Sequence, residues 1–398
     1  MVTRRTVLLG TSALALGAVA GCSGAATPDG SASGPVSPTG AGTAPSPGRP
    51  EPTGSASTAG SPSPGPRADA TPSVPTHPRP ELDGTLADGL DVPWGIAFLR
   101  SGAAVVGERG TGRLLHVSPT GRTRTLGEVA GVVAPSGLGE GGLLGLALAP
   151  GDEDTLFAHH TSGSDNRVVR LSLAGSRVGR PRAVLTGIPT STHHHGGRLL
   201  FDRDGMLLVS TGDAEQSELA QDRASLAGKI LRIRPNGRVA PGNPFGNRTW
   251  SYGHRNVEGL ALDAAGRLWA TEFGDKRADE LNLVQPGRNY GWPEVEGRSR
   301  RYTSPKATWS PTSSCSPAGL AIAGSTAFVG ALQGRCLFAV PLEGPRAGRP
   351  RAWFAGDHGR IRSVALAPDA SLWVTTSNTD GRVEPGRDDD KILRVRLS

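Results

Sequence analysis

A pattern of apolar and polar positions recurs six times along the later part of the chain. Each copy opens with a small residue and an aliphatic pair, passes through a turn rich in Gly, Asp or Pro, and continues into a second alternating run. The copies begin at Gly95, Gly145, Gly197, Gly259, Gly319 and Ser363. Alternation with a period of two, interrupted by such turns, predicts antiparallel strands that are neighbours in one sheet.

The spacing of the copies predicts the architecture. Successive copies start 50, 52, 62, 60 and 44 residues apart, which leaves room for about four short strands in each and is typical of a β-propeller blade. A parallel β-helix would have a much shorter period, and an immunoglobulin-like array would have longer units. We therefore expect an all-β, six-bladed β-propeller with four antiparallel strands per blade, in which residues 391–397 close the ring with residues near 86–92.

Composition separates the first part of the chain from these repeats. All 18 aromatic residues lie beyond position 82, whereas 14 of the 33 prolines fall between positions 23 and 82. A segment of Ser, Thr, Gly, Ala and Pro cannot bury enough apolar area to offset its ordering entropy. Residues 23–82 are therefore predicted to be a disordered, semi-stiff linker, and residues 83–398 to be the propeller domain.

The amino terminus resembles an export signal. Residues 1–22 contain the twin arginines Arg4 and Arg5, an apolar stretch at 7–20, and the sequence VAGC ending at Cys22. The stretch is too short to span a membrane but suits a signal peptide, and VAGC resembles a bacterial lipobox. A plain cleaved signal is the alternative. Lipidation of Cys22 would hold an exported protein on the extracytoplasmic face of the cell membrane.

Charge and cysteine content narrow the classes of partner. The net charge is +7, but only four of the 43 basic residues are lysines, and the repeats contain no dense basic run. We therefore expect a solvated, mildly basic surface and no nucleic-acid partner. Cys315 and Cys336 lie in the fifth repeat and could form a disulfide in an exported protein. The alternative is a pair of small buried thiols.

Three consecutive histidines are the local feature that most suggests chemistry. In an extended segment, His193 and His195 would share one face and His194 would point to the other. The first two could bind a transition metal, although no third ligand is identifiable. His194 could instead act as a base in the channel, with Asp213 on the next strand accepting a hydrogen bond from its ring. Histidines without a functional role are the alternative.

Several segments, taken together, resemble one enzyme family. The segments are GEGGLLGLALAP at 139–150, HHHGGRL at 193–199, WSYGHRNVEGL at 250–260, EFGDKRADELNLVQPGRNYGWPEVEG at 272–297 and GRIRSV at 359–364. They resemble the soluble pyrroloquinoline-quinone-dependent aldose sugar dehydrogenases and their glucose and sorbosone dehydrogenase relatives, over about residues 88–398. The specific part is GHRN followed by ELNL and NYGWP. The fold of that family, a six-bladed propeller with the quinone and a calcium ion at the channel mouth, agrees with the repeat count.

The resemblance implies roles for individual residues. His194 would be the catalytic base, supported by Asp213, for oxidation of the C1 hydroxyl of an aldose or related sugar with hydride transfer to the quinone. Arg255 would help to polarise that quinone. The cofactor contacts would be Glu140, Arg255, Asn256, Gln333, Arg360 and Arg362. The resemblance names a sugar as substrate and leaves the electron acceptor unknown.

The resemblance also implies calcium ligands. Backbone carbonyls of Gly274 and Asp275 occupy the positions that hold the cofactor's calcium in the family. Glu280 and the carbonyl of Tyr290 resemble a second, structural calcium site. Oxygen ligands of this kind are those that calcium prefers.

Three positions depart from the family pattern. Gln333 stands where the family has a lysine, Glu140 where its best-known members have glutamine, and Asp275 where they have proline. The first two changes disfavour binding of a polyanionic quinone, because one removes a positive charge and the other adds a negative one. Two alternatives therefore stay open: a metal-dependent, lactonase-like hydrolase on a six-bladed propeller, and a non-catalytic binding propeller like the hedgehog-interacting proteins.

Overall fold

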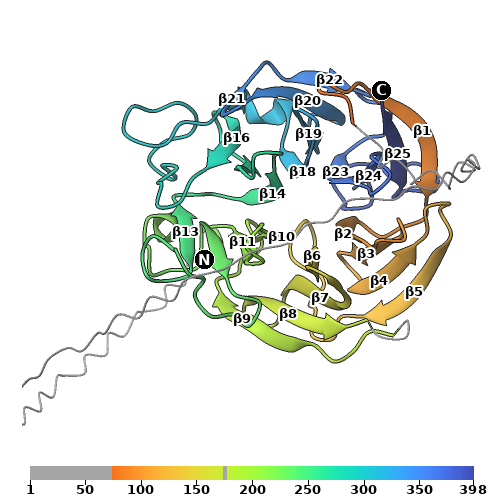
Figure 1. Cartoon of the computed structure of the whole chain (residues 1–398), viewed down its shortest axis with the longest axis horizontal. Coiled ribbons are helices and arrows are strands. Elements are labelled where there is room, and N and C mark those ends of the chain that lie inside the picture. The colour runs from red at the N-terminus through yellow and green to blue at the C-terminus, as the bar shows by residue number, and fades with distance from the viewer. Residues whose placement is uncertain (1–73, 174–176) are drawn as a thin grey trace, which may run out of the picture. The chain divides into compact units, whose positions relative to one another are not determined.

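Six antiparallel sheets surround a central channel in the computed structural model, which describes residues 74–173 and 177–398 (Figure 1). The inner strand of each sheet lies beside the inner strand of the next, in the order β2, β6, β10, β14, β18, β23 and back to β2. The six repeats are therefore six blades, and the predicted six-bladed, all-β propeller is confirmed.

The first three blades each contain four strands in chain order. Blade 1 contains β2 (Pro93–Phe98), β3 (Ala104–Glu108), β4 (Arg113–Val117) and β5 (Thr123–Glu128). Blade 2 contains β6 (Leu143–Ala149), β7 (Asp152–Thr161), β8 (Asn166–Ser172) and β9 (Arg182–Ile188). Blade 3 contains β10 (Gly196–Phe201), β11 (Leu207–Thr211), β12 (Lys229–Ile233) and β13 (Thr249–Tyr252).

The other three blades vary this plan. Blade 4 contains β14 (Val257–Leu262), β15 (Leu268–Glu272), β16 (Asp279–Val284) and β17 (Ala307–Trp309). In blade 5, two short strands share the outer position beside β18 (Pro317–Ala323), β19 (Thr326–Ala331) and β20 (Cys336–Glu343), namely β21 (Arg346–Ala347) and β22 (Arg351–Trp353). Blade 6 contains β23 (Ile361–Leu366), β24 (Leu372–Thr376), β25 (Ile392–Leu397) and β1 (Pro80–Ala87). Two short 3-10 helices are η2 (Ser217–Ala220) and η3 (Thr312–Ser314).

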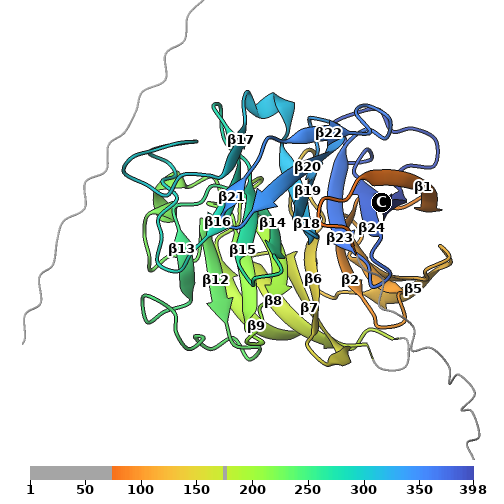
Figure 2. The same cartoon turned by 45° about the horizontal axis from the view of Figure 1, so that its top comes forward.

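The ring closes by pairing the two ends of the propeller. β1 pairs antiparallel with β25, with Pro80 opposite Leu397, and Figures 1 and 2 both place β1 beside the carboxyl end. The predicted partner, residues 86–92, is wrong except at its first two positions. Gly89, with φ of 65°, ends the extended run, and the residues after it lead into blade 1.

The propeller includes residues that precede position 83. β1 begins at Pro80, and the amide of Ser325 in blade 5 donates a hydrogen bond to the carbonyl of Thr76 (2.6 Å). The predicted signal peptide, Cys22 and the linker up to residue 73 lie outside the described residues, so the lipid anchor and export stay predictions. Within 74–173 and 177–398, no helix is long and apolar enough to cross a membrane.

The core is divided among the junctions between blades. Each of six clusters of buried apolar side chains lies between two neighbouring blades. Between blades 4 and 5, for example, Trp269 and Trp309 belong to the same cluster as Leu320 and Val329. A blade therefore buries its faces only against its neighbours, which explains why the repeats must form a closed ring.

The small residue that opens each copy allows inner strands to approach closely. A Cβ atom on Gly145 would lie 2.2 Å from the carbonyl oxygen of Gly197, and one on Gly259 would lie 2.6 Å from that of Ala318. The sixth copy has Ser363 instead, whose hydroxyl donates a hydrogen bond to the carbonyl of Trp94. The repeated glycine is therefore a packing requirement between blades.

The two described cysteines are free thiols. Cys315 and Cys336 are both buried in the cluster between blades 4 and 5 and form no disulfide. Burial raises the pKa of Cys336 to about 11, so little thiolate is present for exchange. The disulfide expectation is therefore wrong for this structure, and the two side chains act as small apolar groups of the core.

Candidate active site

Loops from several blades meet at one end of the channel. His194, Arg255 and Arg360 lie within two residues of the start of inner strands, and Asp213 and Gln333 lie within two residues of the end of second strands. Because each second strand is antiparallel to its inner strand, all of these loops emerge at the same end of the ring. They surround a cavity of about 200 Å³, whose lining includes six of the predicted residues: Glu140, His194, Arg255, Gln333, Arg360 and Arg362.

His194 is held in an unusual backbone conformation. Its φ is 59°, and its carbonyl oxygen lies where a Cβ atom on residue 212 would be, which is why Gly212 is needed there. Its amide donates to Glu140 Oε2 (3.0 Å), and its Nδ1 lies 2.7 Å from Asp213 Oδ1. Nε2 has no hydrogen-bond partner within the described residues, so it is the nitrogen that a substrate could reach.

The other two histidines do not form the predicted pair. His193 lines the same cavity as His194 and its Nδ1 lies 3.1 Å from Glu215 Oε1. His195 is buried, with Nδ1 3.1 Å from the side-chain oxygen of Asn166. The expected alternation is wrong because these residues precede β10 and His194 has a positive φ. Among the described residues, no three His, Cys, Asp or Glu side chains form a metal site.

Asp213 is fixed by several donors. Its side chain is buried, Oδ2 accepts a hydrogen bond from the Trp292 indole (2.7 Å), and Oδ1 accepts one from the amide of Glu215 (2.9 Å). Its own amide donates to the carbonyl of Arg255. The carboxylate therefore holds the His194 ring in one orientation. Trp292 belongs to the NYGWP segment, but sequence reasoning assigned it no role.

The two residues of the GHRN motif have different positions. The Arg255 guanidinium lines the cavity, with Nη2 3.3 Å from Asp275 Oδ1 and the carbon Cζ 5.4 Å from the centre of the Trp292 ring. Asn256 is fully buried behind the cavity, and its Oδ1 accepts the amide hydrogen of Gly196 (2.9 Å). Asn256 Nδ2 has no partner within the described residues. Asn256 therefore supports the turn after the histidines.

Arginines and buried carboxylates occupy the opposite side of the cavity. Arg360 Nη2 lies 3.1 Å from Asp380 Oδ2, and Arg362 Nη1 lies 3.1 Å from Glu258 Oε2. Burial raises the pKa of Glu258 despite Arg362. Burial also opposes ionisation of Asp380, but the neighbouring arginines outweigh it and hold the pKa of Asp380 below its ordinary value. Sequence reasoning missed both carboxylates: Glu258 lies within the WSYGHRNVEGL segment but was assigned no role, and Asp380 lies outside the motif segments.

Glu140 and Gln333 both line the cavity. Of these two, Glu140 forms an ion pair with another residue of the lining. Glu140 Oε1 lies 3.4 Å from Arg382 Nη2. Although burial opposes ionisation, the amide of His194 and the charge of Arg382 hold the pKa of Glu140 below its ordinary value. The amide of Gln333 donates to the carbonyl of Cys315, and its exposed side chain makes no hydrogen bond within the described residues. The negative charge expected at Glu140 is therefore compensated.

A smaller cavity lies behind Arg255. It has a volume of about 10 Å³, and its lining includes Gly274, Glu280 and Tyr290 but not Asp275. Burial, followed by the charge of Glu272, raises the pKa of Glu280 to about 8. Because a cation would relieve both effects, this cavity suits the second predicted calcium, the structural one assigned to Glu280 and Tyr290.

The neighbouring carboxylates of this small cavity are engaged with donors. Glu272 accepts hydrogen bonds from the amide of Arg255 (2.6 Å) and from His254 Nδ1 (2.9 Å). Glu296 Oε2 accepts hydrogen bonds from several successive backbone amides, starting with Asp275 (2.7 Å). A calcium ion here would therefore depend on carbonyl oxygens as well as on Glu280. The predicted ligand set, Glu280 with the carbonyl of Tyr290, has this composition.

A family comparison agrees with this geometry. The family model described as Glucose / Sorbosone dehydrogenase matches residues 90–385. The chain belongs to the glucose/sorbosone dehydrogenase family. This is the family of the pyrroloquinoline-quinone-dependent aldose sugar dehydrogenases. It is similar to the aldose sugar dehydrogenase YliI of Escherichia coli strain K12, with 31% identity over 340 residues that cover 75% of this chain and 90% of that protein.

Solved structures of this family share the architecture. The chain is similar to the pyrroloquinoline-quinone-bound aldose sugar dehydrogenase of Streptomyces coelicolor, with 44% identity, a TM-score of 0.78, and coverage of 82% of this chain and 100% of that one. It is also similar to the apo form of the soluble aldose sugar dehydrogenase of Escherichia coli, with 28% identity, a TM-score of 0.69, and coverage of 80% and 99%.

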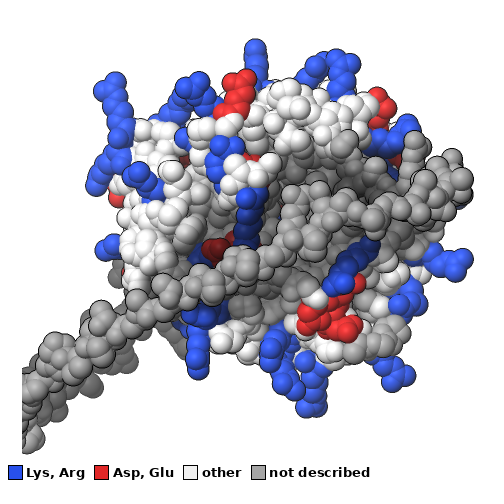
Figure 3. All heavy atoms as spheres, viewed as in Figure 1, with Lys and Arg blue, Asp and Glu red and all other residues white. Residues whose placement is uncertain are grey.

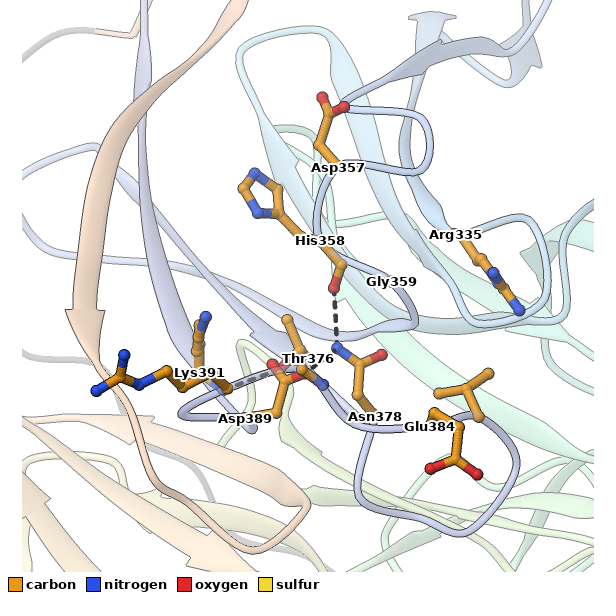
Figure 4. Close-up of a pocket in the computed structure, with 12 residues that line it drawn as sticks. Arg335, Asp357, His358, Gly359, Thr376, Asn378, Glu384, Asp389 and Lys391 are labelled. Atoms are coloured by element: carbon orange, nitrogen blue, oxygen red, sulfur yellow. Dashed lines mark hydrogen bonds between the residues drawn. The ribbon is translucent and has the colours of Figure 1, made fainter.

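A second polar cavity adjoins the site without sharing its charge. It has a volume of about 300 Å³ and is formed by loops of blades 5 and 6 (Figure 4). Asn378 links the two cavities, since its Nδ2 donates to the carbonyl of His358 and its Oδ1 accepts from the amide of Arg360. The charged lining residues balance in number: Arg335, Arg387 and Lys391 against Asp357, Glu384 and Asp389. Nothing in this balance points to a ligand.

The face of the described residues in Figure 3 shows how the basic side chains are distributed. On the face shown in Figure 3, Lys and Arg side chains are spread around the rim rather than gathered in one patch. This distribution agrees with the expected mildly basic, solvated surface.

Proposed function

We propose that the protein is a pyrroloquinoline-quinone-dependent dehydrogenase that oxidises the C1 hydroxyl of an aldose or a related sugar. One observation carries the proposal: the His194 and Asp213 pair faces a cavity whose opposite side is lined by arginines. A hydroxyl that is oxidised must lose a proton to a base, and an anionic redox cofactor needs positive charge around it. The arrangement supplies both.

The charge of the site supports a polycarboxylate cofactor. Five arginines lie in or directly behind the cavity: Arg109, Arg255, Arg360, Arg362 and Arg382. Four carboxylates oppose them: Glu140, Glu258, Asp380 and Asp275, which lies 3.3 Å from Arg255. The arginines outnumber these carboxylates by one, and planar guanidinium forks suit the carboxylates of an anionic ligand.

Unused donors support the same conclusion. Burial, followed by the charge of Arg362, lowers the pKa of Arg109 to about 10. Arg109 Nε, Arg255 Nε and Asn256 Nδ2 are buried without hydrogen-bond partners within the described residues. Buried donors are normally satisfied, so Arg255, the member of this set that lines the cavity, keeps a donor suited to a ligand rich in acceptors. The residues present fit pyrroloquinoline quinone.

The chain's own residues would do the proton chemistry. His194 Nε2 accepts the proton of the sugar hydroxyl, while Asp213 keeps the other ring nitrogen protonated and stabilises the imidazolium that forms. Trp292 keeps Asp213 in place. When bound, the quinone would supply the acceptor for two electrons, and a calcium ion held by the carbonyls of Gly274 and Asp275 would supply a Lewis acid beside it. The second predicted calcium, at Glu280 and the carbonyl of Tyr290, would be structural. The two alternative functions, a lactonase-like hydrolase and a binding propeller, do not account for a base paired with this cationic cavity.

Cofactor binding is the decisive test. We would titrate the full chain with pyrroloquinoline quinone by calorimetry, in calcium and in excess chelator, and then follow dye reduction with a panel of aldoses. We expect tight, calcium-dependent binding and turnover of at least one sugar. A chain that is folded by circular dichroism but binds no quinone in calcium would overturn the proposal.

A further inference from the structure

The loop between β24 and β25 carries an arginine that no motif identifies. Arg382 lies in this loop of blade 6 and lines the same cavity as Gln333, Arg360 and Arg362. Its side chain is 23% exposed, so it is partly desolvated yet still accessible from the cavity. Gln333, which comes from blade 5, contributes a neutral side chain to the same lining.

We propose that Arg382 supplies the positive charge that Gln333 does not, by contacting a carboxylate of the cofactor, and that Glu140 is the residue that positions Arg382. This inference rests on the proposed function. It assigns the cofactor-binding charge to a loop of blade 6. It also gives Glu140, whose negative charge was expected to disfavour the quinone, the role of holding Arg382 in position.

The bonding of Arg382 leaves capacity for a ligand. Nη2 donates to the carbonyl of Leu138 (2.7 Å) and lies 3.4 Å from Glu140 Oε1. Nη1 lies 3.9 Å from Asp380 Oδ2 and has no hydrogen-bond partner within the described residues. A guanidinium has five N–H donors arranged as a fork, so Arg382 retains donors for one more carboxylate.

The nearby carboxylate Asp380 cannot neutralise all of its neighbours. Its Oδ2 atom lies 3.1 Å from Arg360, 3.6 Å from Arg362 and 3.9 Å from Arg382. One negative charge is thus shared by three guanidinium groups, and Arg382 is the most distant of them. Asp380 therefore does not neutralise Arg382 by itself, and beside its contact with Glu140 Arg382 keeps the unpartnered donor Nη1 for an anion.

Glu140 ties this arginine to the catalytic loop. One carboxylate oxygen accepts the amide hydrogen of His194 (3.0 Å), and the other lies 3.4 Å from Arg382. The pKa of this carboxyl is held low by the same two neighbours, so it is charged at neutral pH. Glu140→Gln would keep the contact to His194 but present an amide where Arg382 needs a charged partner.

The test measures the dissociation constant of pyrroloquinoline quinone by calorimetry on the full apoprotein in saturating calcium. We would compare the natural chain with Arg382→Gln, Gln333→Lys and the double variant. We expect Arg382→Gln to weaken binding by about 30-fold, as loss of a charge-assisted contact should, and Gln333→Lys in that background to restore it to within about 5-fold. The weakening should shrink at high salt.

A control on the same loop separates charge from loop structure. Arg387 is 94% exposed, and its one ion pair within the described residues is with its neighbour Asp388, so Arg387→Gln should change the dissociation constant by less than about 2-fold. Thermal unfolding identifies any variant that fails to fold, and Arg382→Lys, which keeps the charge, should bind better than Arg382→Gln.

A second comparison tests the role of Glu140. Glu140→Gln should weaken quinone binding when Arg382 is present and have little further effect in the Arg382→Gln background, because it acts through that arginine. Equal weakening in both backgrounds would overturn the positioning role. Unchanged binding in Arg382→Gln, or no rescue by Gln333→Lys, would overturn the assignment of the charge. If the natural chain itself binds no quinone, the proposed function fails instead.

Discussion

The two halves of the channel mouth use carboxylates in opposite ways. In the half built by blades 3 and 4, Asp213 receives hydrogen bonds from neutral donors and orients one histidine. In the half built by blades 5 and 6, Asp380 is outnumbered by the arginines around it. The first arrangement organises a proton acceptor, and the second leaves positive charge for a ligand. Proton chemistry and anion binding are therefore separable by mutation.

The largest difference between the effect on kcat and the effect on quinone affinity is expected at His194. His194→Asn removes the proton acceptor and keeps a polar side chain that tolerates the positive φ of this position, so kcat for sugar oxidation should fall by about 1,000-fold. Quinone affinity should change by less than about 3-fold, because the arginines that line the cavity are unchanged. Steady-state dye reduction and calorimetry measure the two quantities. A variant that kept more than a tenth of the natural kcat would remove His194 from the base role.

The opposite pattern is expected in the arginine half. Arg360→Met removes a guanidinium but keeps the length of the side chain, so quinone affinity should fall by about 100-fold. At saturating quinone, kcat should fall by less than about 5-fold, because the His194 and Asp213 pair is untouched. Titration followed by assays of the fully loaded enzyme tests this, with thermal unfolding as a check on folding. A kcat loss as large as the affinity loss would contradict the separation of the two halves.

A smaller decrease in kcat is expected when the residue that holds Asp213 in place is changed. Trp292→Phe removes the indole hydrogen bond to Asp213 and retains an aromatic ring beside Arg255. Loss of one hydrogen bond to a carboxylate predicts a decrease in kcat of about 10-fold, with quinone affinity nearly unchanged. Assays at saturating sugar and quinone measure it. Natural activity in this variant would show that Asp213 needs no support from Trp292.

The smallest expected effect is on stability in acid, and it concerns His159, which unlike His194 has no hydrogen-bond partner within the described residues. His159 is fully buried, and neither ring nitrogen has a hydrogen-bond partner within the described residues. Burial, with smaller contributions from His160 and His195, lowers the pKa of His159 to about 3. The unfolded chain binds this proton near pH 6.5. Between these values the unfolded state holds more protons, so the free energy of unfolding falls as the pH drops below about 6.5.

Replacing that histidine should remove this part of the acid sensitivity. His159→Leu should be more acid-resistant than the natural chain by about 1.4 kcal/mol at pH 5.5 relative to pH 7.5, one pH unit below the unfolded pKa. Denaturant unfolding at the two pH values measures the difference. If both chains lost the same stability on acidification, His159 would not be the group responsible.

Most of the fold could be predicted from local patterns, because strand alternation and turns are properties of short segments. The glycine that opens most copies reflects the contact between neighbouring inner strands, and so the number of blades could be read from its spacing. The family motifs likewise predicted His194, Arg255, Arg360 and Arg362, all of which line the cavity. The burial of Asn256 and the absence of Asp275 from the small cavity were not predictable, because both depend on how loops pack.

The sequence by itself thus determined the strand periodicity, the six-fold repeat and the residue types available at the channel mouth. Only the tertiary structure decided which of these residues meet. The positive φ of His194 placed it beside His193 and away from His195, and ring closure brought Glu140 to Arg382, 242 residues away in the chain. The physical reason is that alternation is set by neighbouring residues, whereas ion pairing across a propeller is set by the closure of the whole ring.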